Sequence, residues 1–383
     1  MNYLIRKLLI LALVTLLVNC QTNTNRTKQS DNTSNSVLAM MSSSTDDTGF
    51  KKAIEPIPFQ FPRDFGPHPD FRTEWWYFTG NVSDSTGRLY GFQLTFFRTA
   101  MSPDSVIGDS EWRTSHVYMG HFAITDVVNN TFYQAERFSR GALGLAGAQS
   151  EPFRVWLDDW MIETASDQSG SEIAVHVYAA DDSHKLDLRI VNEKPLVLQG
   201  NNGLSRKGPE PGNTSYYYSY TRLTVSGRIT LDGEQHAVTG HAWFDREWST
   251  SALRPDQAGW DWFSLQLDNG YDLMWYQIRN KDGSLSPFSG GSLVDDDGHR
   301  IEIKPNQVTL NILSTWKSPT GITYPSEWEI IIPSEKLQLH IAPQVKAQEW
   351  TGQFRYWEGV VTFDGIFQNK KTNGYGYVEL TGY

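Results

Sequence analysis

From about residue 54 onward, the chain alternates apolar and polar residues over short segments, which is the two-residue period of a β-strand. No segment keeps the 3.6-residue period of an amphipathic helix. Aromatic and β-branched residues fill the apolar positions, and turn dipeptides such as Asp232-Gly233 and Asn269-Gly270 separate the segments. Many short strands at this spacing predict an all-β fold, either a sandwich or a barrel. The predicted strands span residues 75–82, 89–98, 117–127, 131–138, 153–157, 173–179, 186–191, 216–231, 237–248, 260–267, 271–279, 290–294, 308–315, 328–332, 337–341, 357–367 and 375–383.

The stretch HAWFDREWS, residues 241–249, departs from simple alternation because charges stand among its aromatic residues. On a strand, alternate side chains point to opposite faces, and here both faces carry a tryptophan and a charge. Such a strand is explained by a polar cluster beside a ligand cavity, or by a buried ion-pair network where two domains meet. One face holds His241, Trp243, Asp245 and Glu247, and the other holds Ala242, Phe244, Arg246 and Trp248.

Two segments resemble each other as strand–turn–strand units. Residues 76–98 and 262–279 each begin with aromatic residues and end in FFR or QIR. This similarity predicts two related barrel domains, which we place at residues 54–240 and 241–383.

A loop rich in glycine and proline, residues 194–223, lies between these two segments. Loops of this length in a compact body are often functional. Its last part contains YYYSY, in which Tyr216, Tyr218 and Tyr220 would share one face of a strand. We interpret Tyr218 as a ligand-binding candidate, with a cross-strand aromatic ladder as the alternative.

The N-terminal residues have the pattern of a targeting segment. A basic start is followed by an apolar run, residues 8–18, that is too short to span a membrane, so residues 1–20 read as a signal peptide. The run ends at Cys20, the only cysteine, in a Leu-Val-Asn-Cys sequence similar to a lipoprotein processing site. We expect a lipid on Cys20, and a secreted protein cut nearby is the alternative. Residues 21–53, rich in Ser, Thr and Asn, read as a flexible tether.

Composition narrows the classes of function. With 33 basic and 44 acidic residues the net charge is −11, which argues against a nucleic-acid partner and against docking on anionic lipids. The 14 Trp, 17 Tyr and 19 Phe suit half-buried pleated surfaces and apolar cavities. No HExxH, cysteine cluster or EF-hand pattern occurs, so we expect no metal and no cofactor. The missing GxSxG elbow argues against a serine hydrolase.

Several long motifs resemble one family. EWWYFTGNV, YGFQLTFFR, KPLVLQGNNGLSRKG, GHAWFDREWS, YWEGVV and GYVELTGY are similar to segments of the carotenoid 1,2-hydratase/AttH-like family of lipocalin-like proteins, over about residues 58–383. The resemblance implies two lipocalin-like antiparallel β-barrels packed together. Hydratases of this kind add water across an isolated C=C bond. That reaction needs a carboxylic acid kept protonated by an apolar pocket, and aromatic faces that stabilise a cation.

The resemblance and the order of the strands together suggest a site. Consecutive strands usually pair, so residues 237–248, 260–267 and 271–279 should bring their side chains together at the polar end of a pocket in or beside the second barrel. Many family members carry histidine where this chain has Arg246, and arginine cannot act as an acid or base near neutral pH. We expect Arg246 to pair with a carboxylate of its own segment or with Asp261. The catalytic candidates are Asp245, Glu247, Trp248 and Asp261, and the ligand-binding candidates are Arg246, Trp262, Tyr276 and Tyr218.

Three functions fit these features. The first is an envelope-anchored protein that binds an apolar small molecule, a terpenoid, carotenoid or lipid, with a transport partner that the sequence does not identify. The second is a hydratase-type lyase that acts on a terpenoid, and Arg246 in place of the family histidine favours the first over it. The third is carbohydrate recognition, which would require an open groove with exposed tryptophans. For the first two we expect a location in the bacterial cell envelope, as an outer-membrane lipoprotein facing the periplasm or as a secreted protein.

Overall fold

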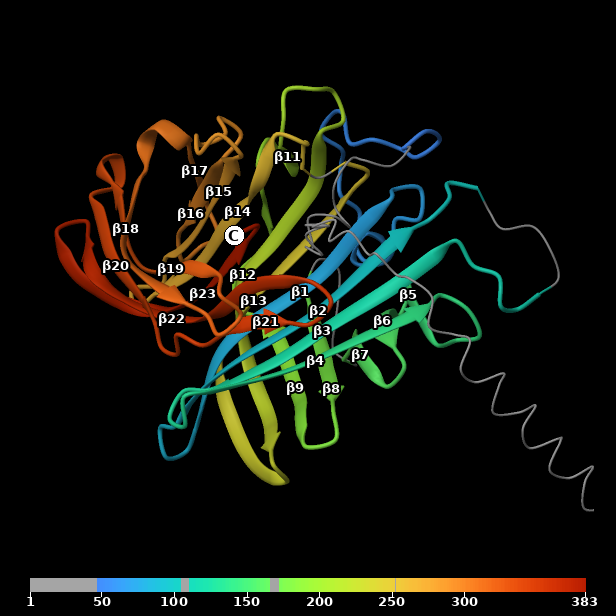
Figure 1. Ribbon diagram of the computed structural model, residues 1–383, viewed down its shortest axis with the longest axis horizontal. Helices are drawn as coiled ribbons and strands as arrows, with labels where there is room; N and C mark the ends of the chain where they lie inside the picture. The colour runs from blue at the N-terminus through green and yellow to red at the C-terminus, as the bar shows by residue number, and fades with distance from the viewer. Residues whose placement is uncertain (1–46, 105–109, 166–171, 252) are drawn as a thin grey trace, which may run out of the picture. The chain divides into compact units, whose positions relative to one another are not determined.

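The computed structural model describes residues 47–104, 110–165, 172–251 and 253–383, which belong to one compact unit (Figure 1). The predicted signal peptide, Cys20 and most of the predicted tether lie outside these residues. The described part of the tether is packed, since Ala53 is buried and Thr214 donates a hydrogen bond to its carbonyl oxygen. In the described residues, the helical elements are three short 3-10 turns, η1 (Arg63–Phe65), η2 (Pro305–Gln307) and η3 (Pro333–Glu335), and none could span a membrane.

The first half of the chain forms a 13-stranded antiparallel sheet that curls into a barrel-like body. The predicted all-β fold is confirmed. Two short strands lie within the predicted loop, β10 (Val197–Leu198) and β11 (Leu204–Arg206). Both pair with β12 (Thr214–Leu231). The order across the sheet is β4 (Thr131–Arg140), β3 (His116–Asp126), β2 (Leu89–Ala100), β1 (Thr73–Asp84), β13 (Glu234–Ser249), β12 (Thr214–Leu231), β9 (His184–Asn192), β8 (Ala174–Ala180), β7 (Trp160–Thr164), β6 (Phe153–Leu157) and β5 (Ala146–Ser150).

The second half forms a 10-stranded antiparallel sheet with the same plan. In both sheets the opening hairpin lies beside the closing hairpin, so the similar segments 76–98 and 262–279 occupy equivalent places. A short strand, β21 (Glu349–Thr351), pairs with β22 (Arg355–Phe367) and lies outside the main strand order. The order is β17 (Arg300–Ile303), β16 (Gly290–Val294), β15 (Asp272–Asn280), β14 (Gln257–Leu267), β23 (Lys370–Thr381), β22 (Arg355–Phe367), β20 (Leu337–Pro343), β19 (Thr323–Ile332) and β18 (Thr309–Lys317).

The division between the sheets falls after β13. We placed the domain boundary between residues 240 and 241, which is inside this strand, because β13 continues in the first sheet as far as Ser249. The β12–β13 hairpin is closed at Asp232-Gly233, where both residues have positive φ angles of 50° and 85°. Two positive φ angles are the signature of a type I′ turn, as the Asp-Gly dipeptide predicts.

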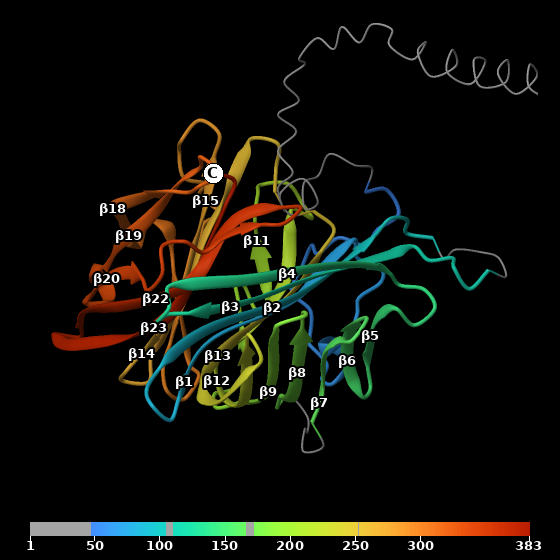
Figure 2. The same cartoon turned by 60° about the horizontal axis from the view of Figure 1, so that its bottom comes forward.

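The two curled sheets pack against each other, and β13 lies where they meet. Figures 1 and 2 show β22 and β23 lying across β1 and β2, and contacts between β1 and β23 and between β2 and β22 join the halves. In the first part of β13, Glu234–His241, only Val238 is buried, whereas every residue from Ala242 to Ser249 is buried. One face of this part fills the first barrel and the other faces the second sheet. This double burial explains why neither face is plainly apolar or plainly polar.

The charge on the barrel side of β13 belongs to a buried ion network. The guanidinium of Arg246 pairs with Glu74 on β1, and Arg98 on β2 pairs with the same carboxylate. All three side chains are at most 1% exposed. Although burial acts to raise it, the two arginines hold the pKa of Glu74 well below its usual range. The expected pairing of Arg246 with its own segment or with Asp261 was therefore wrong.

Candidate functional site

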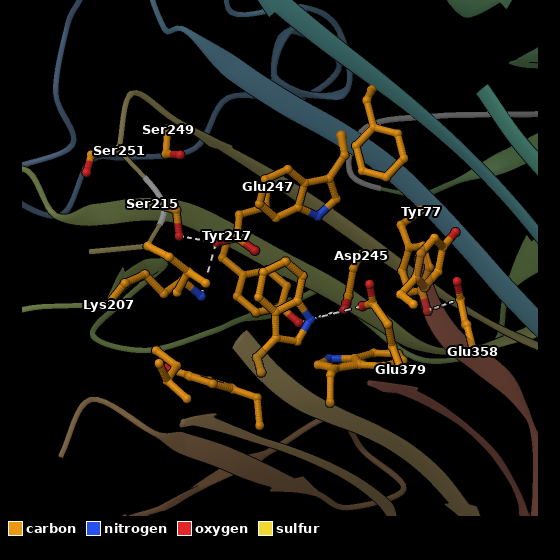
Figure 3. A pocket seen from close by; sticks show the side chains of 18 of the residues that line it. Tyr77, Lys207, Ser215, Tyr217, Asp245, Glu247, Ser249, Ser251, Glu358 and Glu379 are labelled. Atoms are coloured by element: carbon orange, nitrogen blue, oxygen red, sulfur yellow. Dashed lines mark hydrogen bonds and ion pairs between the residues drawn. The ribbon is translucent and has the colours of Figure 1, made fainter. Parts of the chain in front are cut away.

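A cavity of about 100 Å³ lies in the seam between the two sheets (Figure 3). Strands of both sheets supply its walls, so it is beside both barrels and not in the lumen of the second. Its polar lining comes from β1, β12 and β13 on one side and from β22 and β23 on the other. The side chains that line it are Trp75, Tyr77, Gln93, Phe97, Lys207, Ser215, Tyr217, Asp245, Glu247, Ser249, Ser251, Leu253, Trp260, Trp262, Tyr276, Ile278, Tyr356, Glu358 and Glu379.

Asp245 is the most fully bonded carboxylate of the pocket. Tyr217 donates to its Oδ2 atom at 2.6 Å, while Ser219 and Trp243 donate to its Oδ1 atom at 2.5 and 2.7 Å. Burial raises the pKa of Asp245 to about 7, against these three hydrogen bonds, which favour the ionised form. Both of its oxygens are already engaged, so Asp245 holds its neighbours in place more readily than it reaches a ligand.

Glu247 and Lys207 form an ion pair at one end of the pocket. The Nζ atom of Lys207 lies 3.2 Å from Oε1 of Glu247, and Ser215 donates to the same oxygen. Lys207 also stands over the Tyr276 ring, 4.7 Å from its centroid. Although burial acts to lower it, the Glu247 carboxylate raises the pKa of Lys207. This end of the pocket is therefore charged but nearly neutral overall.

Glu358 and Glu379 form a pair of acidic side chains at the other end of the pocket (Figure 3). Tyr77 donates a 2.5 Å hydrogen bond to Oε1 of Glu358, and Trp260 donates to Oε2 of Glu379 at 3.2 Å. Burial, with the Glu379 carboxylate beside it, holds the pKa of Glu358 well above its usual value. Burial also raises the pKa of Glu379 to about 7, and Asp245 and Glu247 add to that shift.

One oxygen of this acidic pair lacks a hydrogen-bond partner. Oε2 of Glu358 is buried and finds no hydrogen-bond partner within the part of the chain that the structure describes. A protonated Glu358 would accept from Tyr77 through Oε1 and carry its own proton on Oε2. An unpaired acid in a buried aromatic pocket is the arrangement that proton donation to an apolar molecule requires.

The structure brings four of the candidates together. Asp245, Glu247, Trp262 and Tyr276 all line the cavity, as the strand order predicts. Trp262 packs edge-to-face against Tyr77 at 5.3 Å, which ties the second sheet to the first. Together these residues form one wall and one end of the pocket.

Four other candidates lie elsewhere. Trp248, Arg246 and Tyr218 point into the first barrel: Trp248 stacks on His68 at 3.7 Å, and Tyr218 donates a hydrogen bond to the carbonyl oxygen of Asp64. Asp261 is not among the residues that line the cavity and instead accepts hydrogen bonds from Gln277, Arg279 and Tyr383. The strand period separates these residues from the pocket, because they occupy the opposite faces of their strands.

Sequence reasoning missed most of the polar lining. Tyr217 lies between the tyrosines singled out in YYYSY, so it faces the pocket while they face the barrel. Glu358 and Glu379 stand in YWEGVV and GYVELTGY, where an acid among buried aromatic residues was a signal of the same kind as HAWFDREWS. Lys207 comes from the predicted functional loop. Among the residues that the structure describes, no group of three or more His, Cys, Asp or Glu side chains is placed to hold a metal ion.

Comparison with known proteins finds two curated relatives, a hydratase and a dehydratase. A kievitone hydratase from Fusarium solani subsp. phaseoli is 26% identical over 213 residues, which cover 53% of this chain and 58% of that protein. The dehydratase AsqC of Emericella nidulans is 26% identical over 207 residues, covering 49% of this chain and 55% of that protein. The chain thus spans little more than half the length of the curated relatives it matches.

Solved structures match over a longer range. The crystal structure of an AttH protein from Nitrosomonas europaea is 36% identical, has a TM-score of 0.76, and is covered completely by 87% of this chain. Kievitone hydratase from Nectria haematococca, 17% identical, has a TM-score of 0.66 over 87% of this chain and 96% of its own, which is a likeness of fold. The AttH-like family model matches residues 52–383. The chain therefore belongs to the AttH-like family and has its lipocalin-like fold of two antiparallel, barrel-like halves.

Proposed function

We propose that this chain is a hydro-lyase that adds water to, or removes it from, a carbon–carbon double bond of an apolar, terpenoid-like molecule. The observation that carries the proposal is a buried aromatic pocket holding four carboxyl groups, Asp245, Glu247, Glu358 and Glu379, against the single ammonium of Lys207. Burial raises the pKa of Asp245, Glu358 and Glu379, and neighbouring carboxylates add to the shift, so acids stay protonated near neutral pH. Two relatives named as a hydratase and a dehydratase support the same reaction class.

In this proposal Glu358 is the proton donor. Glu358 lines the pocket, its Oε2 atom has no hydrogen-bond partner among the described residues, its partner Tyr77 fixes the carboxyl group, and its raised pKa keeps the proton available at neutral pH. The π electrons of the alkene take this proton, which leaves a carbocation on the substrate and a carboxylate on Glu358. Asp245, with both oxygens engaged, orients Tyr217 and does not reach the substrate.

The aromatic walls would stabilise the cation. Trp75, Phe97, Trp260 and Trp262 surround the space beside Glu358 and Glu379, and the negative face of an aromatic ring attracts a cation. Trp262 is buried, while Trp75 and Trp260 are half-buried, so the rings enclose a cavity and do not form an open platform for sugars. At about 100 Å³ the cavity would hold the reacting segment of a long molecule and not the whole of it.

The position of Arg246 changes how its presence is interpreted. From the sequence, the replacement of the family histidine by Arg246 was our reason to favour a binding protein over an enzyme. Arg246, however, lies on the barrel side of β13, where it pairs with Glu74 and stands 4.0 Å above the Trp76 ring. The residue type at position 246 therefore affects the stability of the first barrel. It does not remove any acid from the pocket.

Hydration in heavy-oxygen water tests the proposal. We expect the protein, incubated with acyclic carotenoids or shorter terpenes in H₂¹⁸O, to yield an alcohol that carries ¹⁸O, detected by mass spectrometry. The label should fall strongly in Asp245→Asn, because Tyr217, Ser219 and Trp243 would lose their charged acceptor. A terpene that binds without any label uptake would instead identify a protein that binds apolar ligands.

We further propose that a lipid on Cys20 anchors the protein in the bacterial envelope. The support is the apolar run that ends at the only cysteine. Cys20→Ser should move the protein from the membrane fraction to the periplasmic or external fraction, as measured by fractionation and immunoblotting. Ser34→Ala, outside the processing site, is the control and should stay with the membrane. A Cys20→Ser protein that fractionates like the unmodified chain would rule the anchor out.

A further inference from the structure

A buried chain of hydrogen bonds leads from the pocket to the surface and has no part in the function proposed so far. Tyr356 of β22 lines the pocket, and its hydroxyl lies 2.7 Å from Nδ1 of His121 on β3. Nε2 of His121 lies 3.1 Å from Oε2 of Glu136 on β4. His121 is fully buried, whereas the side chain of Glu136 is 18% exposed. The chain therefore crosses from the second sheet through the first to solvent.

The chemistry of the three groups fixes the direction of their protons. A carboxylate only accepts hydrogen bonds, so a neutral His121 carries its proton on Nε2 and points it at Glu136. The other nitrogen, Nδ1, is then an acceptor, and Tyr356 must donate to it. Burial lowers the pKa of His121, against the effect of Glu136, and so favours this neutral form. Although burial acts to raise it, hydrogen bonds from His121 and from the backbone of Gln353 lower the pKa of Glu136.

The surrounding groups hold this arrangement rigidly. The imidazole of His121 stacks on Trp350 with 4.3 Å between ring centroids, and Phe97 meets it edge-on at 5.4 Å. Gln93 lies 3.5 Å from the Tyr356 hydroxyl. The charged groups near that hydroxyl are carboxylates, Glu358 on the same strand and Glu379 on β23, with Glu136 behind His121.

We propose that Glu136, His121 and Tyr356 form a proton relay that makes the Tyr356 hydroxyl the base of the hydro-lyase, opposite Glu358 as the acid. This inference rests on the proposed function. Tyr356 and Glu358 are two residues apart on β22, so their side chains share the face that lines the pocket. Acid and base would thus act on the same double bond from one strand.

The proton steps balance over a hydration cycle. Water attacks the carbocation that Glu358 has created, and a new C–O bond forms. One water O–H bond breaks as its proton passes to the Tyr356 oxygen, while the proton of Tyr356 moves to Nδ1 of His121. The imidazolium then loses its Nε2 proton to Glu136 and on to solvent, which leaves the remaining proton on Nδ1. In the reset, a proton from solvent reaches Nε2 through Glu136, Nδ1 returns its proton to the Tyr356 oxygen, and Tyr356 gives its own proton to the Glu358 carboxylate beside it. Dehydration follows the same steps in reverse.

The activity test uses variants that keep the hydrogen bonds but not the proton transfer. His121→Gln can still accept from Tyr356 and donate to Glu136, yet it cannot take up a proton. We expect kcat for hydration to fall by about 10²-fold or more, with KM changed by about twofold at most. His176→Gln is the matched control, because His176 also meets a carboxylate, that of Asp187 at 2.9 Å, but its side chain on β8 is 37% exposed. A kcat for His121→Gln equal to that of His176→Gln would overturn the relay.

The pH profile separates a relay from a structural role. His121 must be neutral to accept a proton, so kcat/KM should fall as the pH drops through its folded pKa, which burial sets below 6.5. Glu136→Gln removes the carboxylate that raises this pKa, so the acid limb of the profile should move to lower pH. His121→Gln should remove that limb. An acid limb that neither variant moves contradicts the proposal.

An activity-independent measurement distinguishes failure of the relay from failure of the proposed function. In protein labelled with ¹⁵N-histidine and free of substrate, we expect the NMR signals that disappear in His121→Gln to show a bare Nδ1 and a protonated Nε2. The opposite tautomer in an active enzyme overturns the relay alone. The expected tautomer in a protein that hydrates no terpene overturns the proposed function, and with it the role of Tyr356 as a base.

Discussion

Replacing Glu358 by glutamine is expected to lower the rate of hydration by about 10²- to 10⁴-fold, the usual contribution of a general acid. The amide has nearly the same shape and can still accept the hydrogen bond from Tyr77, but it cannot deliver a proton to an alkene. Substrate binding should change little, because the aromatic walls remain. The measurement is single-turnover hydration beside ligand titration by tryptophan fluorescence.

The same substitution has a defined effect on stability. Because the folded pKa of Glu358 is raised, this group contributes stability that is fully present below its unfolded value of about 4.5. That contribution is lost as the pH rises through the folded pKa. Glu358→Gln should therefore flatten the dependence of the unfolding free energy on pH above about 4.5.

Glu163→Gln is the matched control for Glu358→Gln, since Glu163 lies on β7 with its side chain 38% exposed. It should leave both the rate and the pH dependence of stability near those of the unmodified chain. An Asp245→Asn variant that loses all activity while Glu358→Gln retains it would transfer the role of acid to Asp245.

Arg246→Met should lower the free energy of unfolding by about 3–5 kcal/mol, the cost of breaking a buried ion pair. The substitution leaves Glu74 with Arg98 as its remaining guanidinium partner and removes a 2.7 Å hydrogen bond to the carbonyl oxygen of Gly66. It also removes a cation from the face of Trp76. Urea denaturation followed by fluorescence and circular dichroism measures the change.

Arg154→Met provides the control with the same chemical change. Arg154 pairs with Glu163 at 3.5 Å, and both side chains are about 40% exposed, so the loss should be about 1 kcal/mol or less. At temperatures where Arg246→Met stays folded, ligand binding in the pocket should be retained, because Arg246 lies on the other face of β13. Equal stability of the two variants would contradict the role assigned to the buried network.

A second prediction for this network concerns acid. Glu74 has a lowered folded pKa, so its contribution to stability is present above about 4.5 and is lost as the pH falls through the folded value. In Arg246→Met that folded pKa rises, because one of its two cations is gone. The variant should therefore unfold at a higher pH than the unmodified chain in an acid titration.

The longer strands, and the faces on which their side chains lie, follow from the amino-acid sequence alone. Alternation of side chains along a strand is a local geometric property, so the pattern of HAWFDREWS was enough to separate Asp245 and Glu247 from Arg246 and Trp248. Pairing of consecutive strands was enough to bring Trp262 and Tyr276 toward the same place. The short strands β5, β7, β10, β11, β17 and β21 escaped prediction because a few residues carry too little periodic signal.

Which face of β13 meets which partner depends on how the two sheets pack. An acid among aromatic residues has the same sequence pattern whether it lies inside a barrel or in the seam between two sheets, because both places are buried. Closure of each sheet pairs its opening strand with its closing strand, and packing of the two sheets then places Tyr77 against Glu358 and His121 against Tyr356. Those pairs are more than 200 residues apart in sequence, and no local pattern encodes such a contact. Sequence reasoning could therefore gather one wall of the pocket but not the wall opposite, because the pocket exists only where two separately formed sheets bury their faces together.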